Sequence, residues 1–155
     1  MRSVVAVIIG ISLSAQAWAH DNPGTGEQEC YDVKVSARAI EQVPSVIPDC
    51  GDNCIVGRWP WFVDLEIDRV LKGRSPGRRI RVLTFQHTYI DKGPRTWWLR
   101  HNTDGRFNAR WYAENGVSRC APDAKAAMPY IRPAEGETLD GLRRAGQHQF
   151  DGLPK

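Results

Sequence analysis

The sequence has little of what marks a membrane protein or a nucleic-acid-binding protein. After residue 13 it holds no apolar run long enough to span a bilayer. Its 21 basic residues barely exceed its 18 acidic ones, and so small an excess argues against dedicated binding to nucleic acid or to a membrane surface. There is no internal repeat and no long helical pattern. We therefore expect one domain, without a membrane span and without a nucleic-acid partner.

The familiar motifs of catalysis and cofactor binding are also missing. The sequence contains no G-x-S-x-G, no H-E-x-x-H, no P-loop and no G-x-G-x-x-G. We expect no cofactor. An acid–base pair of Asp and Glu would leave no such motif, because only spacing in three dimensions defines it. An unrecognised hydrolase therefore stays open as an alternative to a non-catalytic protein.

The first residues predict export. Arg2 precedes an apolar run over residues 4–13, and small residues follow, which is the pattern of a secretory signal peptide. Two overlapping A-x-A sites allow cleavage before Trp18 or before His20. We favour the second, which assigns residues 1–19 to the signal peptide. The mature protein is then expected to be periplasmic or secreted.

Cysteine is scarce, but the number of cysteines is even. In an oxidising compartment the four cysteines indicate disulfide bonds, for which three pairings are possible. A four-cysteine zinc site would show two close pairs, and a thioredoxin-like motif would show C-x-x-C. The sequence has neither. We favour Cys50–Cys54, which closes a short loop of turn formers, with Cys30–Cys120, which ties the start of the first strand to the end of the last.

Alternation of apolar and polar residues predicts an all-β protein. Residues 31–40 place Val33, Val35, Ala37 and Ala39 on one face, with polar side chains opposite. Similar patterns predict four more strands, and the gaps between these are turn-sized. Five such strands suggest one antiparallel barrel or sandwich, since closing a sheet hides its edges. The four further strands are expected at residues 61–71, 78–88, 96–102 and 106–114.

The segments outside these strands read as irregular. Residues 20–29 are polar and rich in turn formers, which predicts a mobile lead-in to a domain of residues 30–120. A long loop is expected from about residue 41 to residue 60. Residues 121–155 hold four prolines and few large apolar residues. We expect an irregular, proline-rich tail with at most a short helix near Leu139 and Leu142.

Acidic residues alternate along the second predicted strand. If the following turn is tight, Asp68 faces Arg81 across a hairpin, and such pairs help to fix the register of a solvated sheet face. The three carboxylates of Asp64, Glu66 and Asp68 could also be interpreted as a calcium site. Calcium loops need glycine-bearing turns that bring oxygens around the ion, and these are missing here. The ion-pair interpretation is favoured.

One stretch resembles a known family. The run "FVDLEIDRVLKGRSPGRRIRVLTF", followed by a tryptophan-rich strand and a D-G hairpin, resembles the netrin-module and tissue-inhibitor-of-metalloproteinase type of OB fold over about residues 31–120. The resemblance implies a small five-stranded antiparallel OB-like barrel. The metalloproteinase inhibitors of that type chelate zinc through a mature N-terminal cysteine. This chain offers His20 or Trp18 there, so the inhibitory mechanism is not expected to carry over.

The hairpin around Asp104 and Gly105 predicts a ligand face. A loop of two or four residues would gather aromatic, amide and cationic side chains on one side, a mixture that stacks on sugar rings or packs around a peptide. The alternative is that this face is covered by another part of the chain and forms a second small core. The residues of this candidate face are Trp97, Leu99, His101, Asn108, Arg110 and Tyr112.

A copper site is a further alternative. Cleavage before His20 would leave its amine and imidazole free to chelate Cu(II), with His87 or His101 as a second imidazole. The favoured interpretation remains a domain that uses no metal. The sequence thus predicts an exported, disulfide-bonded, non-catalytic binding module, whose partner is a protein, a peptide or a glycan of the cell envelope or the surrounding medium.

Overall fold

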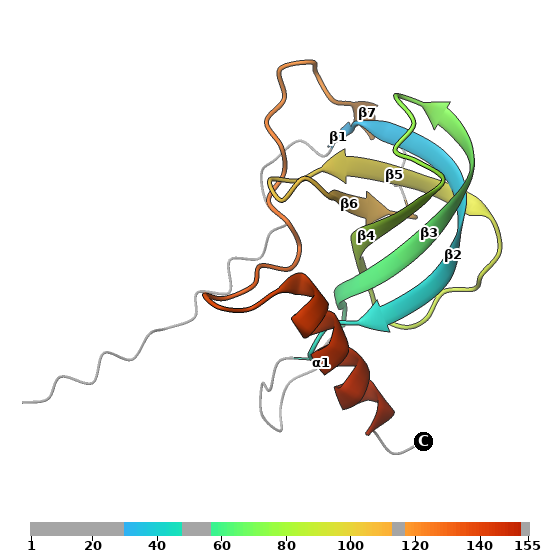
Figure 1. The fold of residues 1–155 in the computed structure, drawn as a ribbon. Helices are drawn as coiled ribbons and strands as arrows, with labels where there is room; N and C mark the ends of the chain where they lie inside the picture. The colour runs from blue at the N-terminus through green and yellow to red at the C-terminus, as the bar shows by residue number, and fades with distance from the viewer. Residues whose placement is uncertain (1–29, 48–56, 113–116, 153–155) are drawn as a thin grey trace, which may run out of the picture.

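The structure is a computed structural model, and it describes residues 30–47, 57–112 and 117–152. Within these residues the chain forms short and long β-strands and a C-terminal α-helix (Figure 1). The elements are β1 (Cys30–Tyr31), β2 (Val33–Pro44), β3 (Trp59–Lys72), β4 (Arg79–Gln86), β5 (Arg95–His101), β6 (Phe107–Arg110), β7 (Ser118–Arg119) and α1 (Leu139–Asp151).

Five of the strands close into a barrel in the order β2-β3-β4-β6-β5. Neighbouring strands are antiparallel except β4 and β6, which run parallel. The last barrel strand thus lies between the third and the fourth, an arrangement found in Greek-key barrels of the OB type. The all-β class and the five-stranded OB-like barrel that we predicted are confirmed, with one parallel pairing among the antiparallel ones.

The inside of the barrel is filled by alternate residues of its strands. On β2, Val33, Val35, Ala37 and Ala39 are at most 3% exposed, as the alternation predicted. They share one cluster with large buried rings from β3 and β5, so small side chains on one wall lie among large ones from the others. The strand runs four residues further than expected, because residues 41–44 continue to pair with β3 instead of starting a loop.

The register between β3 and β4 differs from the predicted one. Asp64, and not Asp68, lies opposite Arg81. The turn is not tight: Ile67 N donates to the carbonyl oxygen of Arg78 at 2.8 Å, and beyond that point β3 leaves β4 and pairs with β2 alone. The displacement is an even number of residues, so the predicted faces of both strands are kept.

A disulfide bond links β1 to the residue that directly follows β7. Cys30 and Cys120 are bonded across a sequence separation of 90 residues, and β1 and β7 beside them pair in parallel. The predicted Cys30–Cys120 bond is confirmed in the structure. The predicted Cys50–Cys54 bond lies outside the described residues.

The C-terminal helix is longer than the single turn expected around Leu139 and Leu142. It begins at a cap in which Gly141 N donates to Thr138 Oγ1 at 3.0 Å. The residues of its inner face, at positions 139, 142, 146 and 150, are spaced by three or four. One of them is Gly146, which comes so close to the end of β2 that no side chain would fit. The missing side chain at this position weakens the apolar pattern in the sequence.

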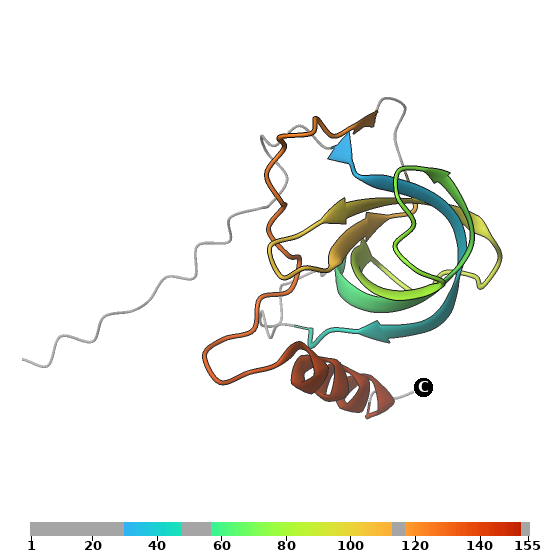
Figure 2. The same cartoon turned by 45° about the horizontal axis from the view of Figure 1, so that its top comes forward.

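The helix and the segment before it cover part of the outer wall of the barrel. Val43, Phe62 and Leu83 point outward from β2, β3 and β4, yet each is at most 3% exposed. Ile131 and Leu139 pack over them and complete a second apolar cluster. Figures 1 and 2 show α1 beside the barrel, next to the end of β2. The tail is therefore an integral part of the fold.

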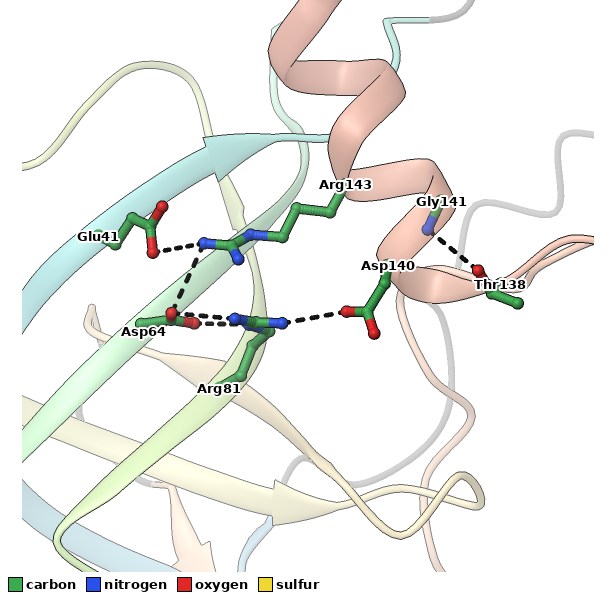
Figure 3. Close-up of polar contacts among 7 residues, drawn as sticks. All are labelled: Glu41, Asp64, Arg81, Thr138, Asp140, Gly141 and Arg143. Carbon is green, nitrogen blue, oxygen red and sulfur yellow. Dashed lines mark hydrogen bonds and ion pairs between the residues drawn. The ribbon is translucent and has the colours of Figure 1, made fainter.

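Polar contacts fix the helix at both of its ends. Near its end, the amide of Gln149 accepts a hydrogen bond from Ile47 N at 2.7 Å and donates to Ile47 O at 3.3 Å. Near its start, Arg143 lies 2.7 Å from Glu41 and 3.5 Å from Asp64 (Figure 3). These contacts hold the helix against β2 and β3.

Arg81 completes this ionic network from the barrel wall. It donates to both carboxylate oxygens of Asp64, at 2.7 and 3.1 Å, and to Asp140 of the helix at 3.1 Å (Figure 3). Asp68 pairs instead with Arg38 at 2.6 Å, and Glu66 with Arg79 at 3.3 Å. Each of the three alternating carboxylates is thus engaged by an arginine, in agreement with the ion-pair interpretation.

Candidate ligand site at the barrel mouth

The predicted ligand face does not form, because the hairpin between β5 and β6 has a different register. Leu99 lies opposite Ala109 and His101 opposite Phe107, so the connection over residues 102–106 holds an odd number of residues. The prediction assumed an even number, and changing the parity of the loop exchanges the faces of one strand relative to the other. The prediction that the six residues share one face is wrong.

The structure divides those six residues among five environments. Trp97 and Leu99 are fully buried inside the barrel, where Trp97 Nε1 donates to the carbonyl oxygen of Ala37 at 3.1 Å. Asn108 is outside but covered by the tail. His101 lies at the far end of β5, with its Nδ1 3.2 Å from Asp32. The two remaining residues are Arg110, whose Nε donates to the hydroxyl of Tyr130 at 3.4 Å, and Tyr112, which lines a cavity.

Asn108 shows how the tail covers this wall. Its Nδ2 donates to the carbonyl oxygen of Met128 at 2.7 Å, and its Oδ1 accepts from Tyr130 N at 3.3 Å. Asn102 also donates to the same Oδ1, at 3.1 Å. The alternative weighed from the sequence, a face covered by another part of the chain, thus describes Asn108.

A cavity of about 380 Å³ opens at the barrel end where β4 and β6 finish and β5 begins. This volume lies within the usual range of small-ligand pockets, and barrel mouths are a common place for them. Its lining is aromatic and polar, with a pair of arginines. The lining residues are Arg58, Phe85, Gln86, His87, Thr88, Tyr89, Ile90, Asp91, Arg95, Trp111 and Tyr112.

Each of the two arginines lies over an aromatic ring. The guanidinium carbon of Arg58 is 4.5 Å from the centre of the Tyr112 ring, and that of Arg95 is 5.0 Å from the centre of the Trp111 ring. Such cation–π contacts hold a guanidinium in place while leaving its N–H groups available to an acceptor. The rings therefore fix two cations at the rim of the cavity.

Asp91 balances one of these charges. Its carboxylate accepts a hydrogen bond from Arg95 and another from Gly93 N at 2.8 Å. These hydrogen bonds, that of Arg95 first, hold the pKa of Asp91 below its usual range. The carboxylate is consequently ionised and already paired near neutral pH. Among the described lining residues, Arg58 is the arginine without a carboxylate partner.

Three buried polar atoms of the lining have no hydrogen-bond partner within the described residues. They are Gln86 Oε1, Arg95 Nε and Trp111 Nε1. Gln86 is only 1% exposed, and its Nε2 donates to Gln42 Oε1 at 3.1 Å. Gln42 is fixed in turn by the backbone of Ile90. These atoms are enclosed by the protein and do not reach the cavity surface, so the polar groups that the cavity presents to a ligand are the arginines held over its aromatic rings.

The two histidines proposed for copper lie at opposite ends of the barrel. His87 lines the cavity, with its Nδ1 2.6 Å from the carbonyl oxygen of Gly57, whereas His101 ends β5 at the other mouth. A site built on His20 could use one of them but not both, and His20 itself lies outside the described residues. Over the parts of the chain that the structure describes, no three His, Cys, Asp or Glu residues form a group that could hold a metal ion.

Sequence reasoning found His87 and Tyr112 among its candidates but missed the rest of the cavity. Its arginines and rings come from the ends of four strands, and Arg58 and Tyr112 are far apart in the chain. A cation–π pair between distant residues leaves no local pattern. The one available signal was the alternation of β6, which extends past its last paired residue to Trp111 and Tyr112.

The fold and the cavity together define a small disulfide-bonded OB-like barrel with a ligand-sized mouth. Compared with known protein families, with curated proteins and with solved structures, the chain matches none. Within the described residues, no helix combines the length and apolar character needed to cross a bilayer.

Proposed function

We propose that this protein is an exported, non-catalytic binding module whose ligand occupies the cavity at the barrel mouth. The observation that carries the proposal is the pair of arginines there, each held over an aromatic ring. Pre-positioned groups with unused hydrogen bonds give affinity and orientation without further ordering.

A binding role fits the acid of the cavity better than a catalytic one. A general acid or base works best with a pKa near the operating pH. Asp91 has a lowered pKa and is already paired with Arg95, so it holds the arginine and is not set to exchange a proton with a substrate.

Export is supported by the predicted signal peptide and by the Cys30–Cys120 disulfide, a bond typical of oxidising compartments. We further propose a relationship to the netrin-module type of OB fold. The barrel order, with its last strand between the third and the fourth, is consistent with that proposal.

The test is a glycan and peptide array probed with the mature protein and with two arginine variants. Arg58→Ala removes the unpaired cation of the cavity. Arg74→Ala is the matched control, because it removes another exposed arginine, from the β3–β4 connection at the opposite end of the barrel. We expect array signals that Arg58→Ala abolishes and Arg74→Ala retains. Signals that survive Arg58→Ala, or no signals at all, would reject the cavity as the binding site.

A further inference from the structure

We propose that Cys30 is a modification site: an external thiol attaches to it by exchange with the Cys30–Cys120 disulfide, and Cys120 leaves as a thiolate that Arg100 stabilises. Arg100 lies near the end of β5, whereas the cavity opens where β5 begins. The site is therefore at the other end of the barrel from the cavity, and it does not depend on the proposed function.

The two sulfurs of this disulfide have different surroundings. Arg100 Nη1 directs a hydrogen bond to Cys120 Sγ at 2.6 Å. The sulfur of Cys30 receives no such hydrogen bond from a described residue. Both cysteines are half-buried and lie outside the two apolar clusters of the domain. The bond is thus near solvent, and one of its two sulfurs has a cation beside it.

The guanidinium of Arg100 is held in this position by other partners. Its Nη1 also donates to Asp32 Oδ1 at 3.0 Å, and its Nη2 donates to the carbonyl oxygen of Lys125. Asp32 is fixed in turn, because its second oxygen accepts a hydrogen bond from His101 N at 2.7 Å. The side chain of Arg100 is only 18% exposed. Asp32 offsets part of the charge, but the N–H group that points at the sulfur stays in place.

The exchange is a single displacement at sulfur. The thiolate of the external thiol attacks Cys30 Sγ and forms a new sulfur–sulfur bond there. The Cys30–Cys120 bond breaks, and its electron pair leaves on Cys120 Sγ. The external sulfur is oxidised to the mixed disulfide while Cys120 is reduced, so the step needs no other oxidant. Such a reaction is faster when the leaving sulfur carries negative charge more easily.

Arg100 makes Cys120 the better leaving group. A disulfide sulfur is a weak hydrogen-bond acceptor, whereas a thiolate is a charged and much stronger one. The hydrogen bond from Arg100 therefore strengthens as the disulfide breaks, and a neighbouring cation stabilises the thiolate that forms. Attack at Cys120 would instead place the charge on Cys30, and the incoming thiol would have to approach the sulfur that Arg100 already contacts. Charge and access both favour attack at Cys30.

The domain is expected to stay folded after the exchange. Neither cysteine belongs to one of the five barrel strands. The backbone contact beside the bond, in which Cys120 N donates to Tyr31 O at 2.9 Å, needs no disulfide. Only the covalent closure is lost. The exchange therefore joins a thiol-bearing molecule to the start of a folded barrel.

The experiment treats the mature protein with β-mercaptoethanol, a neutral thiol whose own charge cannot choose between the sulfurs. The reaction is stopped with N-ethylmaleimide, and peptide mapping by mass spectrometry locates each adduct. Adducts at Cys50 and Cys54 are read separately. The urea-unfolded protein is the baseline, because Arg119 precedes Cys120 in the unfolded chain as well. We expect the ratio of Cys30 adduct to Cys120 adduct to be about tenfold higher in the folded protein, the usual size of one charge-assisted hydrogen bond.

Three variants test the role of Arg100. Arg100→Gln removes the cation and should lower the ratio to the value in urea. Arg100→Lys keeps a cation and should retain a preference for Cys30. Arg38→Gln is the matched control, because it removes an arginine that pairs with Asp68 and contacts neither sulfur; it should leave the ratio unchanged. Thermal melting of each variant establishes that it is folded.

Several outcomes would overturn this site. They are a ratio in the folded wild type equal to that in urea, a majority of adduct on Cys120, or no adduct under conditions that convert the unfolded protein. Equal ratios in the wild type and in folded Arg100→Gln, or in Arg100→Lys and Arg100→Gln, would overturn the role of the Arg100 charge. The wild-type comparison decides even if the Arg100 variants do not fold. None of these results bears on the cavity, which the arrays test.

Discussion

Gly146 of α1 lies directly against the backbone of β2: a β-carbon added to it would stand 2.1 Å from the carbonyl oxygen of Pro44 and 2.9 Å from the carbonyl carbon of Ser45. Backbone atoms cannot turn aside as the end of a flexible side chain can. Glycine costs a helix interior about 1 kcal/mol relative to alanine, and here that cost allows the helix to approach the barrel.

Replacing Gly146 should therefore be destabilising in spite of the better helix propensity of alanine. We expect Gly146→Ala to lower the free energy of unfolding by about 2 kcal/mol, through overpacking against β2. Denaturant unfolding followed by tryptophan fluorescence measures this, since Phe150 of the same helix contacts Trp59 and Trp61. Gly152→Ala is the control, because its nearest neighbours would be at 3.6 Å. Equal stability of the two variants would contradict this packing of α1.

The two adjacent tryptophans of β5 should respond very differently to substitution. Trp97 is fully buried, so Trp97→Ala should cost about 3 to 5 kcal/mol. Trp98 lies on the outside, where Lys34 packs over its ring at 5.1 Å, and Trp98→Ala should cost about 1 kcal/mol or less. Thermal and denaturant unfolding of both variants decide the matter. The opposite order would restore the face predicted from the sequence.

This pair also shows where sequence reasoning stopped. The alternation of β5 was plain. Which of its faces points inward together with a given face of β6 depends on whether the β5–β6 loop holds an odd or an even number of residues. Asn102 sets that parity: its Oδ1 accepts hydrogen bonds from the backbone of Asp104 at 3.2 Å and of Arg106 at 3.0 Å. Asp104 and Gly105 identified a turn without giving its length.

The strands and the Cys30–Cys120 bond could be predicted because alternation and turn residues are local, and an even number of cysteines in an exported chain favours pairing. The helix could not be predicted at full length, because much of its stability comes from packing against β2 and not from propensity. The cavity could not be predicted either. It depends on barrel closure, which brings Arg58 to Tyr112 and Arg95 to Trp111.

Acid should weaken the attachment of α1 through Asp64. Burial raises the pKa of this carboxyl, but the hydrogen bonds and charge of Arg81, with the charge of Arg143, outweigh burial and leave the pKa below its usual value. The folded state thus favours the ionised form. The resulting stabilisation is complete above the unfolded pKa of about 3.9 and is lost as the pH falls through the lower folded value.

The Asp64→Asn variant tests this pH dependence. At pH 7 it should be less stable than the wild type by about 2 kcal/mol, since hydrogen bonds to a charged group are lost. The difference should shrink as the pH falls below about 4. Urea unfolding across that range measures it, with Asp68→Asn, in a more exposed pair with Arg38, as the control that changes little. A difference that does not depend on pH would refute the role of the Asp64 charge.

Loss of the Cys30–Cys120 bond should be the costliest change outside the core. By the chain-entropy relation, a loop of this length contributes about 4.6 kcal/mol, whereas the short predicted Cys50–Cys54 loop contributes about 2 kcal/mol. We expect the corresponding double serine variants to lose stability in that order in denaturant unfolding under oxidising conditions. Equal losses, or no effect of a reducing agent on the wild type, would contradict this account.

The position of Cys30 and Cys120 also determines how the protein would respond to mechanical tension. If the two ends of the chain are pulled apart, the force passes from residue 30 to residue 120 through the sulfur–sulfur bond and bypasses the five barrel strands. The tension instead reaches the segment after Cys120, where the ion pairs of Arg143 and the amide of Gln149 hold α1. The helix would peel away first, and the barrel with its cavity would keep its shape under stretch.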